Sequence, residues 1–287
     1  MLPSFSKKVK TPMNILICVK QVPDTTEIKV DPITNTLMRA GVPSIVNPFD
    51  ACALETAARI KDETPDTKIV IVSMGPEQAK AALTECLAVG ADRAYLISGR
   101  GFGGSDTLAT SYILSCAVKK LEELEGKFDI IFCGKQAIDG DTAQVGPELA
   151  EHLGLAQVTC ALEAKTNGNT VKIRRKTERG SEILGVEMPC LITMTKTAYE
   201  PRYASSRKKR EVAKQEIPTL DENSFDIDLT RAGLKGSPTK VKKTFTIPQN
   251  STGVIFHEAT EQQSTIKLFD LLAKGNILQL GVRYGNE

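Results

Sequence analysis

The first half of the chain alternates between short apolar runs and longer segments with helical spacing. Apolar runs at 14–19, 68–73, 94–98 and 128–133 predict buried strands. The segments between them repeat apolar residues every three or four positions, which predicts amphipathic helices over about 48–61, 77–89, 105–120 and 142–153. Strands separated by helices of this length are typical of βαβ units. We therefore predict an α/β fold with a Rossmann-like, doubly wound parallel sheet.

After Gly154 the pattern changes to strands joined by short links, at 158–162, 170–174, 183–186 and 190–195. A small β-hairpin region is also predicted at 27–39, where Asp-Pro and Asn favour a turn.

The last third of the chain is polar over 196–250 and carries four prolines, a composition that buries little apolar surface by itself. It predicts an extended arm that wraps a partner, followed by an amphipathic helix over about 261–274. We therefore divide the chain into an α/β domain that ends at 195 and a partner-wrapping arm with its C-terminal helix (196–287).

Charge and cysteine content narrow the function classes. The 287 residues include 37 Lys and Arg against 35 Asp and Glu, so no global field favours nucleic acid or an anionic membrane. The seven cysteines include no Cys-x-x-Cys pair and the two histidines no His-Glu-x-x-His motif, which argues against a disulfide framework and against a metal site. No apolar run approaches the roughly 20 residues that span a bilayer, and the first ten residues lack the apolar core of a secretory signal. A cytoplasmic globular protein without a nucleic-acid partner is expected.

A doubly wound sheet binds ligands at the carboxyl ends of its strands. The glycines of the segment 134–146 allow close backbone approach, Thr142 can bond a phosphate, and the following helix offers free N–H groups. Asp139 and Asp141 suit ribose hydroxyls or a turn better than a phosphate. The pattern also fits an ordinary turn rich in Asp and Gly. Three other segments end strands or begin helices at the same edge: 18–21, 47–50 and 73–75.

A second glycine-rich loop, 99–104, leads into Ser105 and Asp106 and a helix that bears Thr107 and Thr110. It matches neither Walker A nor Gly-x-Gly-x-x-Gly. It is faintly similar to the pyrophosphatase (PP) loop of adenylating enzymes, but that loop should follow the first strand and this one follows the third. The loop predicts a second phosphate or flavin contact, and a capped helix after a flexible loop explains it equally well.

Five motifs occur in one order along the chain: Val-Lys-Gln-Val-Pro-Asp (19–24), Asn-Pro-Phe-Asp (47–50), Gly-Ala-Asp-Arg (90–93), Gly-Lys-Gln-Ala-Ile-Asp-Gly-Asp-Thr-Ala-Gln-Val-Gly (134–146) and Glu-Pro-Arg-Tyr (200–203). From Met13 to about its C-terminus, the chain resembles the β subunit of electron transfer flavoprotein, the EtfB/FixA family. Met13 matches the usual start of that family, which implies that residues 1–12 are an extension and that the nucleotide-binding α/β domain spans 13–195. The resemblance implies a Rossmann-like domain paired with an α subunit that holds FAD. It also implies that the β subunit binds either AMP or a second FAD.

Ser-Asp-Thr-Leu-Ala-Thr-Ser (105–111) and Gly-Val-Pro-Ser-Ile-Val-Asn (41–47) are similar to the electron-bifurcating members. That similarity implies an FAD that accepts a hydride from NADH. The similarity further implies that this FAD passes one electron to ferredoxin or flavodoxin. The other electron goes through the α-subunit FAD to an acyl-CoA dehydrogenase-like or other flavin dehydrogenase or reductase. The chain is then an electron-transfer subunit of an NADH-dependent oxidoreductase complex, and no catalytic side chain is expected. The alternatives are an AMP-binding carrier that takes no hydride, a PP-loop adenylating enzyme and a nucleotide-sensing module.

The strand-end pattern and the resemblance together give the expected cofactor contacts. They are Cys18, Asn47, Asp50, Ser73, Met74, Gly75, Asp106, Thr107, Thr110, Gly134, Gln136, Ala137, Asp139, Gly140, Asp141, Thr142, Gln144, Val145 and Gly146.

The expected partner contacts follow the last motif: Pro201, Arg202, Tyr203, Ser206, Arg207 and Lys208. In members that dock acyl-CoA dehydrogenases, this segment presents a leucine, and here Ser206 stands at that place. The departure predicts that a contact of the basic run 207–210 replaces the leucine, although such a run is most often a solvated face.

Overall fold

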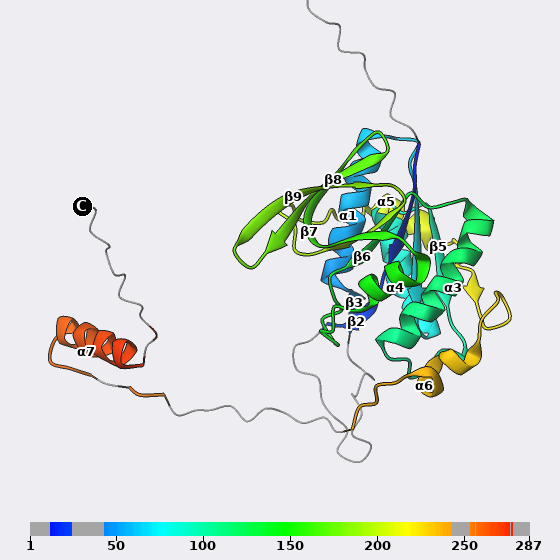
Figure 1. Cartoon of the computed structure of the whole chain (residues 1–287). Coiled ribbons are helices and arrows are strands. Elements are labelled where there is room, and N and C mark those ends of the chain that lie inside the picture. Colours follow the sequence, from blue (N-terminus) through cyan, green and yellow to red (C-terminus); the bar gives the residue numbers. More distant parts are fainter. Residues whose placement is uncertain (1–11, 25–42, 243–252, 256, 276, 278–287) are drawn as a thin grey trace, which may run out of the picture. The chain divides into compact units, whose positions relative to one another are not determined.

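The computed structural model describes residues 12–24, 43–242, 253–255, 257–275 and 277. It divides the chain into two units, 1–244 and 245–287, and the described part of the second contains the helix α7 (Glu261–Lys274) (Figure 1). The predicted hairpin at 27–39 and residues 1–11 of the predicted extension lie outside the described residues.

The first unit is built on a nine-stranded sheet in the order β11-β5-β4-β1-β6-β10-β7-β8-β9. Strands β11 to β7 pair in parallel, and β7, β8 and β9 form an antiparallel extension. This arrangement confirms the predicted α/β class. The strands are β1 (Asn14–Cys18), β4 (Lys68–Met74), β5 (Arg93–Ile97), β6 (Ile130–Gly134), β7 (Ala156–Asn167), β8 (Thr170–Thr177), β9 (Gly180–Glu187), β10 (Cys190–Met194) and β11 (Thr219–Leu220).

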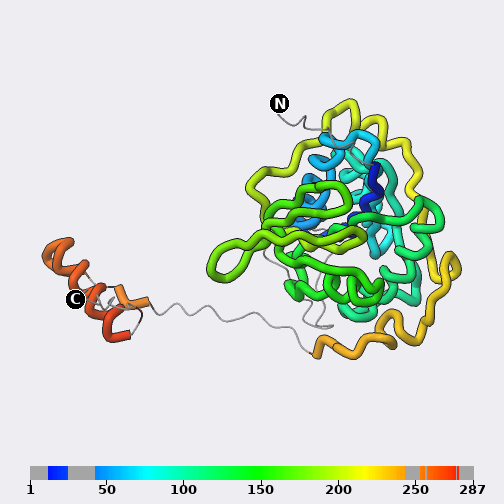
Figure 2. Tube along the Cα trace, turned by 45° about the horizontal axis from the view of Figure 1, so that its top comes forward, coloured from blue at the N-terminus to red at the C-terminus, as the bar shows by residue number. Residues whose placement is uncertain are grey.

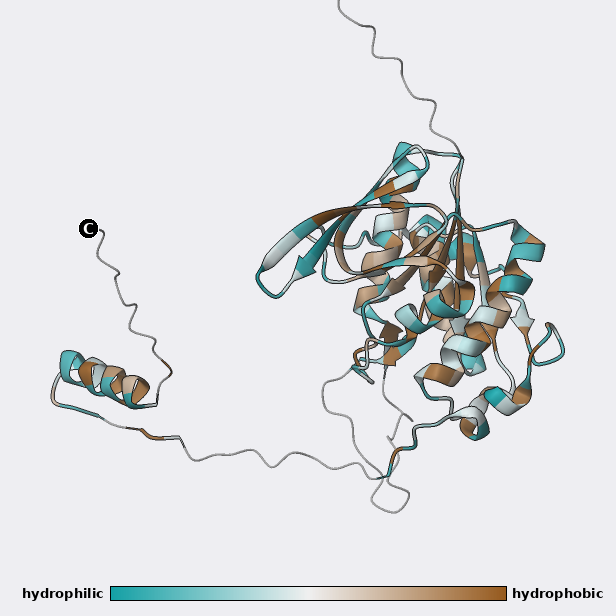
Figure 3. Ribbon diagram, viewed as in Figure 1, coloured by the Kyte–Doolittle hydropathy of each residue, from teal (hydrophilic) through white to brown (hydrophobic). Residues whose placement is uncertain are grey.

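Helices cover both faces of the sheet, which explains why its central strands are apolar throughout. In β1, Ile15 and Ile17 join the core under α1 (Pro48–Glu63) and α2 (Lys80–Val89). Leu16 points to the other face, which packs against α3 (Thr107–Glu125) and α4 (Val145–Leu153). Figure 3 shows these strands as the apolar centre of the unit.

The order of the strands fixes where a ligand can enter. From β1 the chain adds β4 and β5 on one side, and then crosses over α3 to place β6 on the other side. The crevice of a doubly wound sheet lies at such a reversal, outside the carboxyl ends of the strands. Here that position is the ends of β1 and β6. A short antiparallel pair, β2 (Gln21–Pro23) with β3 (Ser44–Val46), follows β1.

One predicted boundary inside the candidate loops differs from the structure. The helix predicted to begin at Thr142 begins at Val145. The reason lies in the backbone, because Asp141 and Ala143 have φ angles of 53° and 54°, outside the right-handed helical region. Residues 142–144 therefore remain an open turn in front of α4.

Residues 206–239 lie against the chain's own α/β domain (Figure 2). Helix α5 (Ser206–Val212) packs on α2, and β11 joins the edge of β5 through hydrogen bonds such as Leu96 N–H to the Pro218 carbonyl at 2.9 Å. Beyond it, η3 (Leu229–Arg231) and α6 (Gly233–Gly236) follow, and α6 packs against η2 (Arg100–Phe102) and the start of α3. This part of the predicted arm wraps its own domain, and its contact with a partner stays a prediction.

The helix predicted over 261–274 is present as α7, and its apolar side chains Ile266, Leu268, Phe269 and Leu271 are each about half exposed. Within the described ranges, no helix combines the length and apolarity needed to cross a membrane.

Candidate nucleotide site

The start of α1 is tied to the ends of both central strands by one carboxylate. Asp50 accepts a hydrogen bond from the backbone N–H of Lys20 at 2.7 Å and another from that of Gly134 at 3.0 Å. The side chain is buried, and burial raises its pKa to about 7 even though these hydrogen bonds and the charge of Lys20 oppose the shift. Asp50 therefore connects the ends of β1 and β6 at the base of the crevice between them.

Asn47 fixes the loop that follows β6. Its Nδ2 donates to the Gln136 carbonyl at 2.9 Å, and its Oδ1 accepts from the Ile138 N–H at 3.3 Å. On the same loop, Asp139 pairs with the ammonium of Lys20 at 2.6 Å. Asn47, Gln136 and Asp139 thus lie at one edge of the sheet, where Asn47 bonds Gln136 and Asp139 bonds Lys20 just after β1; their contact with a cofactor stays a prediction.

Two of the three loop glycines are required by packing within the chain. A Cβ on Gly134 would lie 2.1 Å from Asp50 Oδ1, and a Cβ on Gly146 would lie 2.6 Å from Thr193 Cγ2. At Gly134 and Gly146, the atoms that come close to the backbone therefore belong to the chain itself and not to a ligand. Gly140 differs, because no described atom lies within 4 Å of the position its Cβ would take, and it faces open space.

The turn between Gly140 and α4 presents unused backbone donors. The N–H groups of Thr142, Ala143 and Gln144 donate to no protein atom in the described part of the chain. Ala143 has positive φ while Gln144 is right-handed, an alternation that turns successive N–H groups toward one concavity. The N-terminus of α4 follows directly, so the turn is suited to an anion. Non-glycine residues with positive φ are uncommon and often mark ligand sites.

The end of β4 adds an unpartnered hydroxyl. Ser73 Oγ is buried and has no hydrogen-bond partner among the described residues, and Met74 and Gly75 follow it at the half-buried strand end. On β1, Cys18 is half-buried and is the register partner of Cys133 on β6. The hydrogen bond with Cys18 and burial raise the pKa of the Cys133 thiol well above its usual range, so this thiol stays neutral.

The second glycine-rich loop meets the first through Thr107. Its hydroxyl lies 3.5 Å from Gln144 Oε1 and 3.2 Å from Glu148 Oε1. Thr110, one turn further along α3, is half-buried, and its hydroxyl has no hydrogen-bond partner in the described ranges. The two loops therefore form one continuous polar edge.

The carboxylate of Asp106 bonds groups of its own chain. One carboxylate oxygen caps α3 by accepting from the Ala109 N–H at 3.0 Å. The other accepts from the backbone N–H and the hydroxyl of Thr239, at 2.9 and 2.6 Å. Both oxygens thus have partners, as the capped-helix alternative predicts for this residue.

Comparison with known proteins decides the family. Residues 34–223 match the electron transfer flavoprotein domain. Over 256 residues the chain is 51% identical to electron transfer flavoprotein subunit beta of Megasphaera elsdenii. The matched region covers 88% of this chain and 95% of that protein. The chain belongs to the electron transfer flavoprotein β-subunit family.

Two further relatives in this family are named as parts of reductase complexes. The CarD subunit of the caffeyl-CoA reductase-Etf complex of Acetobacterium woodii is 42% identical over 266 residues, with 93% of this chain and 100% of that protein covered. The γ electron transfer subunit of acryloyl-CoA reductase of Anaerotignum propionicum is 44% identical over 272 residues, covering 93% and 100%. An electron transfer flavoprotein β subunit implies an α-subunit partner and work within a dehydrogenase or reductase complex.

The predicted partner contacts of this β subunit fall into two groups. Arg202 is held by its own chain, where its guanidinium and backbone N–H bond the buried Glu55 and its guanidinium also bonds Asp62. Burial alone would raise the pKa of Glu55, but the hydrogen bonds and charge of Arg202 outweigh it and hold that pKa below its ordinary value. The second group is accessible: Tyr203 is 93% exposed, and Ser206, Arg207 and Lys208 form the exposed first turn of α5. Pro201 is half-buried before them.

Sequence reasoning missed Glu55 and Lys20. Glu55 interrupts the apolar run Ala53, Leu54, Ala57 and Ala58 of α1, and a lone acid on a buried helix face is a signal for a buried ionic partner. Lys20 lies within the segment 18–21, but its pairing with Asp139 depends on the sheet order, which brings the ends of β1 and β6 together.

Proposed function

We propose that this chain binds FAD as the β subunit of an electron-bifurcating electron transfer flavoprotein and accepts a hydride from NADH. In this proposal the chain forms a heterodimer with an α subunit that holds a second FAD. Ferredoxin or flavodoxin is the low-potential electron acceptor. A flavin dehydrogenase or reductase in the cytoplasm receives the other electron. The relatives named as parts of caffeyl-CoA and acryloyl-CoA reductase complexes support a reductase of this type.

The residues at the strand ends fit a dinucleotide. The orphaned hydroxyl of Ser73 suits a polar atom of a nucleoside, and the free N–H groups of 142–144 suit a pyrophosphate. Bound flavin supplies the hydride and electron chemistry. The chain's own work is to bind and orient the cofactor, and it needs no nucleophile or general base for that.

The observation that carries FAD over AMP is the contact of Thr107 with Gln144. It joins the phosphate turn in front of α4 to the glycine-rich loop in front of α3, so a ligand held at 142–144 can extend along one polar edge. AMP would end at the phosphate turn and would not reach the hydroxyls of Thr107 and Thr110. We assign the adenine half to the ends of β1 and β4 and the flavin half to Thr107 and Thr110.

The test is the cofactor content of the purified αβ heterodimer, measured by denaturing the protein and separating the released nucleotides. Two FAD per heterodimer and none of AMP are expected. One FAD with one AMP would assign the chain to the simple carriers instead and overturn the proposal.

We also propose that residues 240–287 and the exposed first turn of α5 contact partners. The apolar stripe of α7 supports this, since Ile266 and Phe269 are 57% and 48% exposed within the described residues. Limited proteolysis of the chain with and without the α subunit tests it: cleavage after 240 should slow markedly in the heterodimer. Equal cleavage rates would contradict it.

A further inference from the structure

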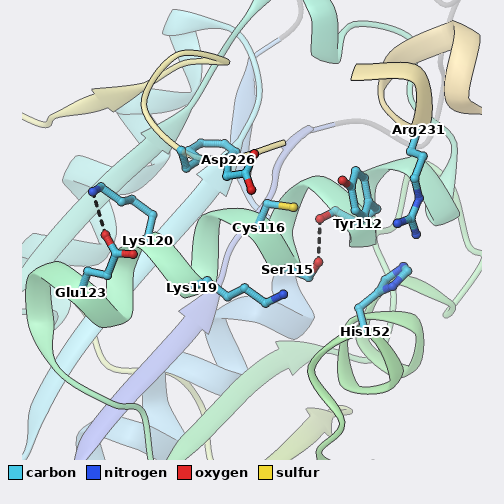
Figure 4. Close-up of a pocket in the computed structure, with 10 residues that line it drawn as sticks. Tyr112, Ser115, Cys116, Lys119, Lys120, Glu123, His152, Asp226 and Arg231 are labelled. Atoms are coloured by element: carbon cyan, nitrogen blue, oxygen red, sulfur yellow. Dashed lines mark hydrogen bonds and ion pairs between the residues drawn. The ribbon is translucent and has the colours of Figure 1, made fainter. Parts of the chain in front are cut away.

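A pocket of about 480 Å³ lies between α3, the last turn of α4 and the segment that follows β11 (Figure 4). One wall is a single face of α3, which carries Tyr112, Ser115 and Lys119 at helical spacing. His152 of α4 and Arg231 of η3 close the other side. Along α3, Tyr112 lies about 8 Å and Lys119 about 18 Å from Thr107, and none of the residues that line the pocket is among the predicted cofactor contacts.

Three cationic or proton-binding side chains converge at one end of this pocket. Arg231 stacks over the Tyr112 ring, with 3.9 Å from Cζ to the ring centroid, and His152 meets the same ring edge-on at 5.9 Å between centroids. In Figure 4, Lys119 extends toward the same region. Neither Arg231 nor Lys119 forms an ion pair within the described ranges. Two unpaired positive charges beside a histidine form an end of the pocket that favours an anion.

One further polar atom at this end has unused bonding capacity. It is not the Tyr112 hydroxyl, which accepts from the Asp228 N–H at 3.0 Å and also bonds Cys116. His152 Nε2 is shielded from solvent and has no hydrogen-bond partner among the described atoms. A polar atom that is shielded from solvent and has no partner destabilises the protein, and a bound ligand that bonds it would remove this cost.

The opposite end of the pocket is not basic. Lys120 pairs with Glu123 at 2.8 Å, which neutralises both, and Asp226 adds a carboxylate. In Figure 4, Lys120 and Glu123 lie away from Arg231 and His152, and Asp226 lies between the two ends, beside Cys116. The positive charge is therefore concentrated at one end of the pocket, which orients the anionic group of a ligand.

The charges that face His152 come from all three elements around it. Burial lowers its pKa, and the positive charges of Arg231 and Lys119 lower it further, while Glu148 and Glu151 on its own helix act in the opposite direction. An anion between the cations would cancel their effect and stabilise the protonated imidazole. Binding of an anion and protonation of His152 are therefore linked.

We propose that this pocket binds a small molecule through a phosphate or carboxylate group, held by Arg231, Lys119 and His152. The guanidinium supplies paired donors that match either anion, and the ammonium adds charge. The proposal stands independently of the assigned cofactor and of the α subunit.

His152 can serve as a spectroscopic probe of the pocket, because the chain has only one other histidine, His257, and that residue belongs to the other unit. The imidazole resonances of the ¹³C-histidine-labelled full-length chain are followed against pH in chloride, inorganic phosphate or acetate at equal ionic strength. The pKa of His152 should rise by about one unit in at least one of the two oxyanions, which corresponds to about tenfold tighter binding to the protonated form. The resonances of His257 serve as the control and should be the same in all three salts. A larger rise in phosphate identifies a phosphate-bearing ligand, and a larger rise in acetate identifies a carboxylate.

Matched variants show whether the pocket causes the response. Arg231→Gln and Lys119→Gln should each weaken anion binding about tenfold, because each removes a charge-assisted contact. Lys120→Gln is the control, since it lies on the same helix and its charge is already paired with Glu123. If Arg231→Gln disturbs the fold, Lys119→Gln decides, because its side chain is exposed. An unmoved His152, equal shifts of both histidines, or an unchanged response in Lys119→Gln would overturn the proposal.

Discussion

Asp50 Oδ1 accepts a hydrogen bond from the backbone N–H of Gly134, with 3.0 Å between the two atoms. This contact joins the first turn of α1 to the end of β6 across the point where the sheet reverses its order. It explains why Gly134 must lack a side chain, and it makes the geometry of the candidate site dependent on the packing of α1.

Gly134→Ala should destabilise the fold, whereas Gly140→Ala should not. The new Cβ at 134 would lie 2.1 Å from Asp50 Oδ1 and 2.8 Å from Phe49 Cβ, so α1 must move, at a cost of about 1–3 kcal/mol. At 140 the space is open, and we expect a change within about 1 kcal/mol of zero. Urea unfolding of the two variants makes the comparison. Equal stabilities would contradict the packing role of Gly134.

Asp50 should make the stability of the chain depend on pH between 5 and 7. Its pKa is raised to about 7, so the native state keeps a proton that the unfolded chain has released above pH 4. Its stabilisation is therefore present at low pH and is lost as the pH rises toward 7, by at most about 1.4 kcal/mol per unit. The free energy of unfolding of the native protein minus that of Asp50→Asn, from urea titrations at pH 5, 6 and 7, should fall with pH. His152, whose pKa is lowered, acts in the opposite direction and cancels in this difference. A flat or rising difference would show that Asp50 is ionised throughout.

Gly140→Val should release the nucleotide without unfolding the protein. Its side chain would extend into the open space in front of the free N–H groups of 142–144, where we place the phosphates. Thr142→Val, which removes a single hydroxyl, should weaken retention by only about 1–2 kcal/mol. Nucleotide bound per heterodimer after gel filtration measures both effects. Full retention of the nucleotide in Gly140→Val would show that its phosphates do not bind at this turn.

Thr110→Val should loosen the flavin that we assign to this chain. Its hydroxyl makes no hydrogen bond within the described part of the protein, so the substitution should remove the proposed contact with the flavin and leave the fold intact. Thr107→Val should add to the loss, although it also removes the donor to Glu148 Oε1. The two FAD molecules are distinguished by their order of release during dilution. NADH-driven reduction should fall together with occupancy of the β-subunit site while the α-subunit FAD is retained. Equal loss of both flavins would point to a folding defect instead.

Arg202→Gln should destabilise the chain by about 1–3 kcal/mol, because Glu55 would remain buried without its main partner. Arg207→Gln is the control: Arg207 is 87% exposed and pairs with Glu211 on the surface, so its loss should cost less than about 0.5 kcal/mol. Thermal unfolding of the two variants side by side provides the measurement. If both were equally stable, the Glu55 pair would contribute nothing to the fold.

The repeating βα pattern was sufficient to predict the sheet because each central strand is apolar throughout and each helix has one apolar face. The helix at 261–274 was predicted for the same reason, since its stripe follows the helical period. The start of α4 was placed three residues early, because nothing in the residue types of Asp141 and Ala143 indicates a left-handed backbone.

Site residues were harder to predict than elements. A carboxylate such as Asp50 at a strand end can face a ligand or a neighbouring backbone N–H, and the residue type is the same in both cases. The same holds for Asp106, whose two oxygens are used by Ala109 and Thr239. The pairing of Asp106 with Thr239 joins segments far apart in the sequence, so local patterns carry no trace of it. What local patterns did indicate is the edge of the sheet at which these groups gather.

The two-residue strand β11 protects an otherwise open border of the sheet. Through Leu96 and Ser98, the outer side of β5 donates to the carbonyls of Pro218 and Leu220, groups contributed by chain made long after β5 itself. Until that late segment arrives, β5 presents unpaired backbone groups of the kind that recruit strands from other molecules. A chain cut short before residue 218 would keep the central sheet and leave that border open. It should therefore self-associate, whereas a chain that includes residues 218–220 covers this edge of the sheet with its own backbone.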